Sequence, residues 1–358
     1  MNIYATSDIH GFHTERFDVL NKRGTSLLID NGDFFMGSAQ ASYWNHREGK
    51  NHLIHLANQL GYDVMVPGNH DFDYGLDYYL GIVKQLNCEV ISCNIFDLEG
   101  KHIFKPYTII ERGGKTYGII GAMTSNLSQI SLFENVRGLR VESAPNEIRK
   151  TVDTIKDNVD VVIVSYHGGI ECDLATGKAT QYDTGEDQAY RIANEIAGID
   201  LLICGHQHRE NDGVVNGTQI VQVPSQLRKI AVYGEDGSLS WLESNKEPKV
   251  DLEYEAWLNE RLDVSHFESF VSSIIEADCY WFKFKGETIR HFKDSFHPIY
   301  PLSVYHFNED EWSNPLGIKD HYTVCSNVDL GSPRLQGTSV MNVFDAYYHF
   351  MSQKPSSE

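Results

Sequence analysis

The chain has 358 residues, a length that favours one large domain plus one small one. Its hydrophobic content of 41% and charged content of 22% are ordinary for a globular protein. Thirty basic against fifty acidic residues give a formal net charge of −20, which argues against a surface that binds a nucleic-acid polymer or an anionic membrane.

The first residues and the cysteines predict a soluble cytoplasmic protein. Residues 2–6 have the pattern of a strand, not of a basic segment followed by an apolar one, so we expect no signal peptide. No apolar stretch approaches the roughly twenty residues of a membrane-spanning helix. The six cysteines are scattered without a Cys-x-x-Cys pair, and we expect reduced thiols instead of disulfides.

Side chains that can bind metal follow the first two predicted strands. The strand over residues 2–7 leads into Asp8 and His10, which are two residues apart and therefore point to the same side of an extended backbone. A carboxylate and an imidazole in this relation can chelate one ion. The strand over residues 26–30 is followed by Asp33. Taken alone, Asp33 could equally cap a turn or a helix.

The third strand, predicted over residues 62–66, stops at Pro-Gly and then presents Asn69, His70 and Asp73. Asn69 offers a neutral oxygen to a cation, and His70 can exchange a proton near neutral pH. Asp73 is close enough along the chain to orient that imidazole. For this stretch alone, the alternative is a polar turn with a capping aspartate before the next helix.

Two later strands end in histidines. Residues 160–165 form a buried strand before His167, and residues 199–204 form another before His206 and His208. The other expected elements are a strand at 89–93, a hairpin of 107–111 with 115–120, antiparallel strands from about 215 to 242, and helices over 52–60, 76–86, 145–157 and 185–197.

Five strand ends therefore carry groups that can bind metal, whereas the strand interiors hold almost no ionisable residues. The carboxyl ends of strands are where open α/β sheets place their ligands. We therefore expect these groups to meet in one metal site.

The motifs Asp8-x-His10, Gly32-Asp33, Gly68-Asn69-His70-Asp71, His167 and Gly205-His206-x-His208 resemble those of the calcineurin-like metallophosphoesterases. Within that family they are most similar to the 5′-nucleotidase and 2′,3′-cyclic-nucleotide phosphodiesterase group, as is the run Thr184–Gln188. The resemblance spans residues 1 to about 245. It implies an α/β fold, a four-layer α-β-β-α sandwich, followed by a small aromatic-rich C-terminal segment or domain.

The resemblance also implies two divalent metal ions, and the mixed nitrogen and oxygen donors suit Mn, Zn or Fe. The first ion would be held by Asp8, His10, Asp33 and His208, and the second by Asp33, Asn69, His167 and His206, with Asp33 shared. A hydroxide formed at such a pair attacks the phosphorus of the substrate.

His70 would then serve as the general acid for the leaving alkoxide, oriented by Asp73. Histidines that bind metal cannot do this while they are ligated.

We predict two domains, a dinuclear phosphoesterase domain over residues 1–245 and a small C-terminal domain over residues 251–358. The second holds 19 of the 41 aromatic residues, which indicates a folded segment, and one interpretation is a reduced substrate-covering domain. The alternative is that these aromatics pack a core or an interface. A Gly-Gly-rich arginine motif, which the resemblance leads one to expect beside nucleoside-stacking aromatics, is absent from the sequence.

The resulting hypothesis is a metal-dependent phosphomonoesterase that hydrolyses nucleoside 5′-monophosphates or similar small phosphate esters. The alternative is a 2′,3′-cyclic-nucleotide phosphodiesterase. A more remote alternative is a non-catalytic interaction module, although such a module has no need of a complete ligand set. We expect a small phosphate ester as partner, no nucleic-acid polymer and no membrane, and the sequence leaves the oligomeric state open.

Overall fold

The computed structural model describes residues 1–243 except 12–13, 23, 47–51 and 132, and beyond them only Glu253, 282–283 and 323–324. The chain divides into two units, Met1–Lys249 and Val250–Glu358. In the second unit β15 (Phe282–Lys283) pairs antiparallel with β16 (Thr323–Val324). The C-terminal domain expected over 251–358 otherwise lies outside the described residues and stays a prediction.

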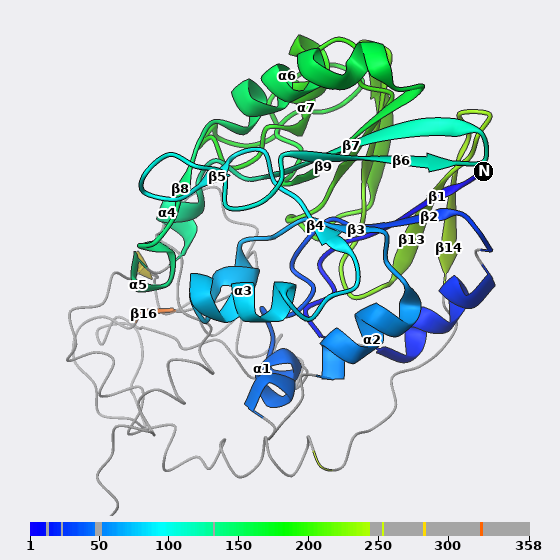
Figure 1. Cartoon of the computed structure of the whole chain (residues 1–358). Helices are drawn as coiled ribbons and strands as arrows, with labels where there is room; N and C mark the ends of the chain where they lie inside the picture. The colour runs from blue at the N-terminus through cyan, green and yellow to red at the C-terminus, as the bar shows by residue number, and fades with distance from the viewer. Residues whose placement is uncertain are drawn as a thin grey trace, which may run out of the picture. The chain divides into compact units, whose positions relative to one another are not determined.

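Two six-stranded sheets form the centre of the first unit (Figure 1). The first sheet has the order β14 (Leu239–Glu243), β13 (Lys229–Tyr233), β1 (Ile3–Thr6), β2 (Leu27–Asp30), β3 (Val64–Met65) and β4 (Glu89–Val90). The second has the order β11 (Asn211–Val215), β12 (Thr218–Gln222), β10 (Leu201–Cys204), β9 (Val161–His167), β7 (Lys115–Met123) and β6 (Tyr107–Arg112). A separate pair consists of β5 (Ile95–Phe96) and β8 (Arg140–Val141).

Each sheet has a parallel centre. Strands β1 to β4 are parallel to one another, and so are β7, β9, β10 and β12. Strands β13, β14, β11 and β6 are antiparallel to their neighbours. The antiparallel strands expected from about 215 to 242 are formed by β12 with β11 and by β14 with β13, and β12 has a parallel neighbour as well. That strand pairs with β11 across the tight turn at Asn216 but lies parallel to β10 on its other side.

Helices cover the outer face of each sheet. The first sheet packs against η1 (Thr14–Lys22), α1 (Ala39–His46), α2 (His52–Leu60) and α3 (Leu76–Val83). The second packs against α6 (Ala144–Ile155) and α7 (Ala189–Glu195). Shorter elements are η2 (His70–Phe72), α4 (Leu127–Ile130), α5 (Phe133–Val136) and η3 (Lys156–Asn158). Figure 1 shows the two helical layers on opposite sides of the sheets. The four-layer α-β-β-α sandwich is confirmed.

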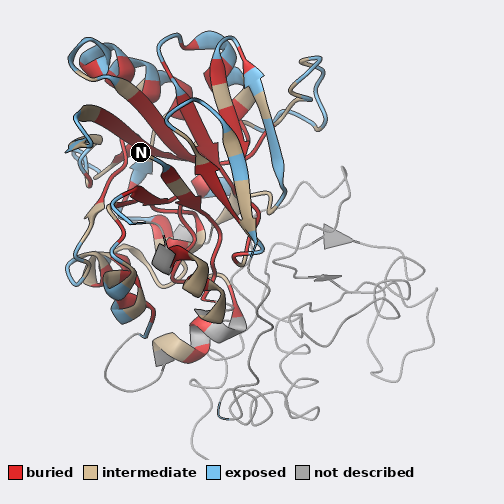
Figure 2. Ribbon diagram, turned by 90° about the vertical axis from the view of Figure 1, so that its right-hand side faces the viewer, coloured by how far each residue is buried: buried red, intermediate tan, exposed pale blue. Residues whose placement is uncertain are grey.

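The continuous apolar runs of the central strands follow from burial on both faces. Ile29 and Ile163 lie in the core between the sheets, whereas their neighbours Leu28 and Val164 pack under the outer helices. Successive side chains of a strand alternate between its faces, so a strand covered on both sides needs apolar residues at every position. Figure 2 shows the buried residues concentrated along both sheets.

The helix expected over residues 185–197 is shorter, since α7 begins only at Ala189. Gly185 has φ of +76°, outside the helical region. The side chains of Glu186 and Asp187 bond to residues of other loops instead of to the helix. The segment before α7 is therefore fixed by tertiary contacts and not by helical hydrogen bonds.

Among the described residues Cys88, Cys93, Cys172 and Cys204 are free thiols, and Cys279 and Cys325 lie outside that part of the chain. No helix in the described ranges combines the length and the apolar character needed to cross a membrane.

Candidate metal centre and active site

The parallel strands of both sheets bring together predicted site residues that lie up to 200 positions apart in the sequence. Among the residues that the structure describes, two groups of side chains have donor atoms that all lie within 4.8 Å of one another. One consists of Asp8, His10 and His208, and the other of Asp8, Asp33 and His167. Asp8 belongs to both, so the two groups adjoin.

In the first group, two imidazole nitrogens and a carboxylate oxygen lie close together. The Nε2 atoms of His10 and His208 are 3.0 Å apart, and Nε2 of His208 is 3.4 Å from Oδ1 of Asp8. The Nδ1–H of His10 donates to the carbonyl oxygen of Met36 (2.7 Å). A carbonyl can only accept, so Nδ1 carries a proton and Nε2 of the neutral ring has a lone pair directed at the group.

The carboxylate of Asp8 is anchored on one oxygen only. Its Oδ2 accepts hydrogen bonds from the hydroxyl of Ser7 and from the backbone N–H of His206 (3.0 Å). Its Oδ1 is buried and has no hydrogen-bond partner. A buried carboxylate oxygen without a donor is costly unless a cation lies beside it.

The second group repeats the arrangement. The Nδ1–H of His167 donates to the carbonyl of Asn31 (2.7 Å). Its Nε2 lies 3.1 Å from Oδ1 of Asn69 and 3.2 Å from Oδ2 of Asp33. Asp33 raises the pKa of the metal-free His167 ring to about 10 against the effect of burial, so this pocket favours a positive charge. Without an ion, a proton on Nε2 satisfies these two oxygens; with a divalent ion among the three atoms, the neutral ring offers its Nε2 lone pair instead. The donor set therefore fits divalent metal ions, and neutral imidazole with carboxylate and amide oxygen is a set suited to such ions.

Three further predicted residues, His206, His70 and Asp73, lie in the same region without joining these groups. His206 turns its Nε2 toward Oε1 of Glu186, 2.8 Å away. The Nδ1 of His70 bonds to Oδ2 of Asp73 at 2.9 Å, and the ring of His70 is edge-on to that of His10 with centroids 5.3 Å apart. The His70–Asp73 pair expected from the sequence is thus formed beside the first group.

The charges of the site favour ionised aspartates and a protonated His70. Burial acts against ionisation, but the histidines around Asp8 and Asp33 hold the pKa of both carboxyl groups well below the usual range. Burial likewise opposes the imidazolium form of His70, but Asp73 and Asp33 together raise its pKa to about 9. A protonated imidazole is the form that a general acid requires.

The backbone of the site is strained at the predicted ligands. Asp8, His10, Asp33, His206 and His208 all have φ between +51° and +66°. This left-handed region is unfavourable for residues other than glycine, and such residues concentrate at functional sites.

Two glycines allow the ligand loops to approach. A Cβ at Gly68 would collide with the carboxylate and the backbone nitrogen of Asp33, and one at Gly205 would collide with the side chains of Ser7 and Asp8. Neither position can hold a larger residue without moving a predicted ligand.

Sequence reasoning assigned no role to Asp71, which organises two of the ligand loops. Its carboxylate accepts hydrogen bonds from the backbone N–H groups of Asp33 (3.0 Å), Phe35 (3.2 Å) and Gly68 (2.9 Å). Asp71 belongs to one of the motifs that predict the site, but nothing in a sequence reveals which backbone amides a carboxylate accepts.

A polar network around Gln207, also missed, holds the loop of the last two histidines. Its Nε2 donates to Oδ2 of Asp187 (2.7 Å) and its Oε1 accepts from Nε2 of Gln222 (2.9 Å). Gln207 stands between His206 and His208, so the network fixes the segment that carries both rings.

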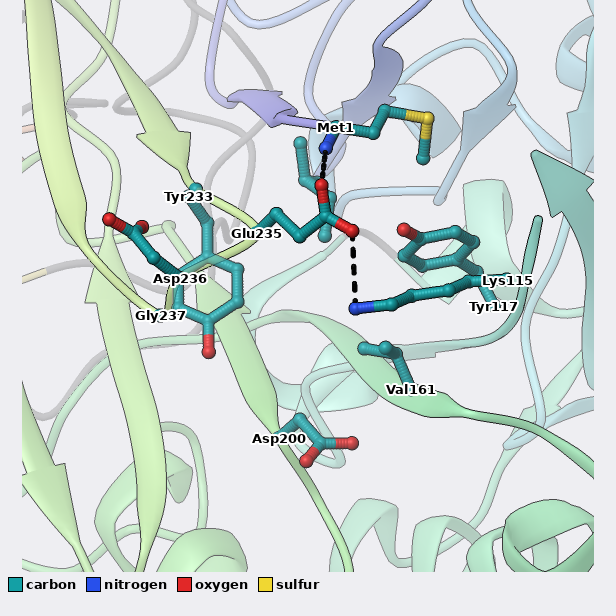
Figure 3. A pocket seen from close by; sticks show the side chains of 11 residues that line it. Met1, Lys115, Tyr117, Val161, Asp200, Tyr233, Glu235, Asp236 and Gly237 are labelled. Atoms are coloured by element: carbon teal, nitrogen blue, oxygen red, sulfur yellow. Dashed lines mark hydrogen bonds and ion pairs between the residues drawn. The ribbon is translucent and has the colours of Figure 1, made fainter. Parts of the chain in front are cut away.

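A cavity of about 300 Å³ lies at the opposite, amino-terminal ends of the parallel strands, between Tyr117 and Tyr233 (Figure 3). Glu235 bonds there to Lys115 (3.3 Å) and to the amino group of Met1. The convergence of donor atoms, and not this cavity, locates the candidate active site.

The four-layer fold and the donor set are those of an α/β protein with a candidate divalent-metal centre. The chain belongs to the calcineurin-like phosphoesterase family, whose model matches residues 1–210. The chain is 30% identical to the 2′,3′-cyclic-nucleotide 2′-phosphodiesterase/3′-nucleotidase of Haemophilus influenzae over 61% of its own length and 39% of that protein. It is 28% identical to the 5′-nucleotidase of Bos taurus over 51% of its length and 29% of that protein. The match thus spans well under half of the length of each of these two relatives.

A solved structure shares the fold. The calcineurin-like phosphoesterase YfkN from Bacillus subtilis superposes with a TM-score of 0.59 at 23% identity, over 73% of this chain and 96% of that one.

Proposed function

We propose that this protein is a metal-dependent phosphomonoesterase that hydrolyses nucleoside 5′-monophosphates or similar small phosphate esters. The observation that carries the proposal is the buried Oδ1 of Asp8, which accepts no hydrogen bond and lies 3.8 Å from Nε2 of His10 and 3.4 Å from Nε2 of His208. Asp8, His10, Asp33 and His208 would hold one divalent ion, and Asp33, Asn69, His167 and His206 a second. Such an ion pair clamps phosphoryl oxygens and lowers the pKa of a bound water.

The residues of the chain supply the remaining steps. His70, held by Asp73, would donate a proton to the ester oxygen that leaves, because an alkoxide is a poor leaving group. The backbone N–H of His70 donates to Oδ1 of Asp33 (2.8 Å), which ties the acid to the carboxylate that both ions would share.

The cyclic phosphodiesterase remains the second candidate, since relatives of both kinds match the chain. We favour the monoesterase because a carboxylate at Asp73 keeps His70 cationic, which suits protonation of a ribose or alkyl oxygen. The identity of the metal (Mn, Zn or Fe) and the cytoplasmic location remain predictions from the sequence.

Chelation tests the proposal. Treatment with EDTA should abolish hydrolysis of p-nitrophenyl phosphate and of AMP, and added Mn²⁺ or another divalent ion should restore it. Asp33→Asn should be the most damaging ligand substitution because it would weaken the binding of both ions. Full activity of protein shown by elemental analysis to be free of metal would refute the proposal.

A substrate panel separates the two candidates. We expect kcat/KM to be higher for nucleoside 5′-monophosphates than for 2′,3′-cyclic nucleotides and similar across the bases. A strong preference for the cyclic substrates would favour the alternative. A hundredfold preference for one base would require about 2.7 kcal/mol of base recognition, for which the sequence shows no motif.

A further inference from the structure

His206 differs from the other predicted histidine ligands in the ring nitrogen that it engages. His10 and His167 each donate Nδ1–H to a backbone carbonyl and leave Nε2 directed at the site. In His206 it is Nε2 that meets a partner, the Oε1 atom of Glu186 at 2.8 Å. An ionised carboxylate can only accept, so Nε2 of His206 carries the proton.

The lone pair of the neutral His206 ring is therefore on Nδ1. A metal-binding histidine usually donates its other ring N–H to a carboxylate or a carbonyl, and this bond fixes both the tautomer and the ring orientation. Glu186 supplies such a carboxylate to His206, as the carbonyls of Met36 and Asn31 supply acceptors to His10 and His167.

Glu186 is itself held firmly. Its backbone carbonyl accepts hydrogen bonds from the hydroxyls of Thr124 (2.7 Å) and Tyr166 (3.0 Å). The next residue, Asp187, accepts from the backbone N–H of Gly169 (2.6 Å) and from the side chain of Gln207. The side chain of Glu186 is 30% exposed and that of His206 is 13% exposed. The pair therefore stands on an anchored segment and is not a chance contact between two mobile surface groups.

We infer that Glu186 is a positioning residue for the second metal ion, holding His206 in the tautomer and orientation in which Nδ1 faces that ion. The inference rests on the proposed function, because it needs the second ion of the pair. It also explains why the chain does not begin α7 until Ala189. Continuing the helix back through Glu186 would give up the backbone position from which this side chain reaches His206.

Metal affinity tests this inference without relying on activity. The metal-free full-length protein is titrated with Mn²⁺ by calorimetry, for the wild type and for Glu186→Ala, Glu186→Gln and Asp183→Asn. The glutamine keeps an amide oxygen that can accept from Nε2–H. Asp183 lies on the same segment, is exposed, and accepts a local hydrogen bond from the N–H of Gly185, so its variant controls for loss of charge.

We expect Glu186→Ala to lower the affinity for the second Mn²⁺ ion by about 10- to 100-fold, while the first Mn²⁺ ion binds as in the wild type. Glu186→Gln should lose clearly less, and Asp183→Asn should match the wild type. As a second readout, nitrogen-15 NMR of the Zn²⁺-loaded protein should show the His206 proton on Nε2 in the wild type.

Three results would overturn the inference: two ions bound by Glu186→Ala with unchanged affinity, tighter binding of the second ion, or equal losses in the alanine and glutamine variants. Equal losses would indicate that the charge of Glu186 acts directly on the ion. A wild type that binds no ion would instead refute the proposed metal centre and this inference with it.

Discussion

Replacing His70 with asparagine should remove the proton donor while the metal centre stays intact. Asp73 and Asp33 raise the pKa of His70 to about 9 against the effect of burial, so the protonated ring is favoured at pH 7, unlike that of a histidine with an ordinary pKa. The substitution therefore removes an imidazole that its neighbours hold in the acid form. We expect kcat to fall by about 10²- to 10⁴-fold, which corresponds to roughly 2.7–5.5 kcal/mol of transition-state stabilisation.

The assay compares two leaving groups. The loss should be large for AMP, whose ribose oxygen needs a proton, and small for p-nitrophenyl phosphate, whose nitrophenolate leaves without one. Metal content, measured by elemental analysis, should stay at the wild-type level, because the contact from position 70 to Asp33 is made by the backbone N–H. An equal loss on both substrates would refute the acid role and indicate a ground-state contact instead.

Two further substitutions probe the same site, and a third, in α3, is the control for the second. Asp73→Asn removes a charge that raises the pKa of His70. Because His70 is active as an acid only when protonated, kcat should begin to decline at a lower pH than in the wild type. A pH–rate profile with an unchanged alkaline limb would contradict this. Gly68→Ala places a Cβ against Asp33 and should cost about 1–3 kcal/mol in urea unfolding. Gly81→Ala, in α3 with open space around it, should stabilise by up to about 1 kcal/mol, and similar values for the two variants would show that Gly68 is not tightly packed.

The sequence predicted the strands and the residues at their ends because both signals are local. An apolar run followed by a polar residue at a glycine marks the carboxyl end of a buried strand, and parallel pairing then gathers those ends at one edge. Asp8 and His208 are 200 residues apart in the chain, yet their side chains lie 3.4 Å apart. The unbroken apolar run that contains Leu28 and Ile29 likewise predicts a strand buried on both faces, and the two side chains do pack on opposite sides of the sheet.

Features that depend on distant partners could not be read from the sequence. Residues 185–188 look like the first turn of a helix, but Glu186 and Asp187 bond to other loops and delay that helix. The sequence also gives no sign of which nitrogen a histidine engages. For His206 this depends on a carboxylate 20 residues away.

The backbone of the predicted ligands shows why so many polar groups surround the site. Five ligands adopt positive φ, and each such residue costs about 1–2 kcal/mol relative to the right-handed region. Their sum is comparable with the whole net stability of a typical domain, about 5–15 kcal/mol, so the surrounding bonds must offset it. Asp71, with its three backbone amides, and Gln207, with its side-chain bonds to Asp187 and Gln222, act on the loops where this strain lies. The fold thus holds the donor atoms in place before any ion arrives. An ion that binds only the folded chain then adds stability in proportion to the logarithm of its concentration over its dissociation constant.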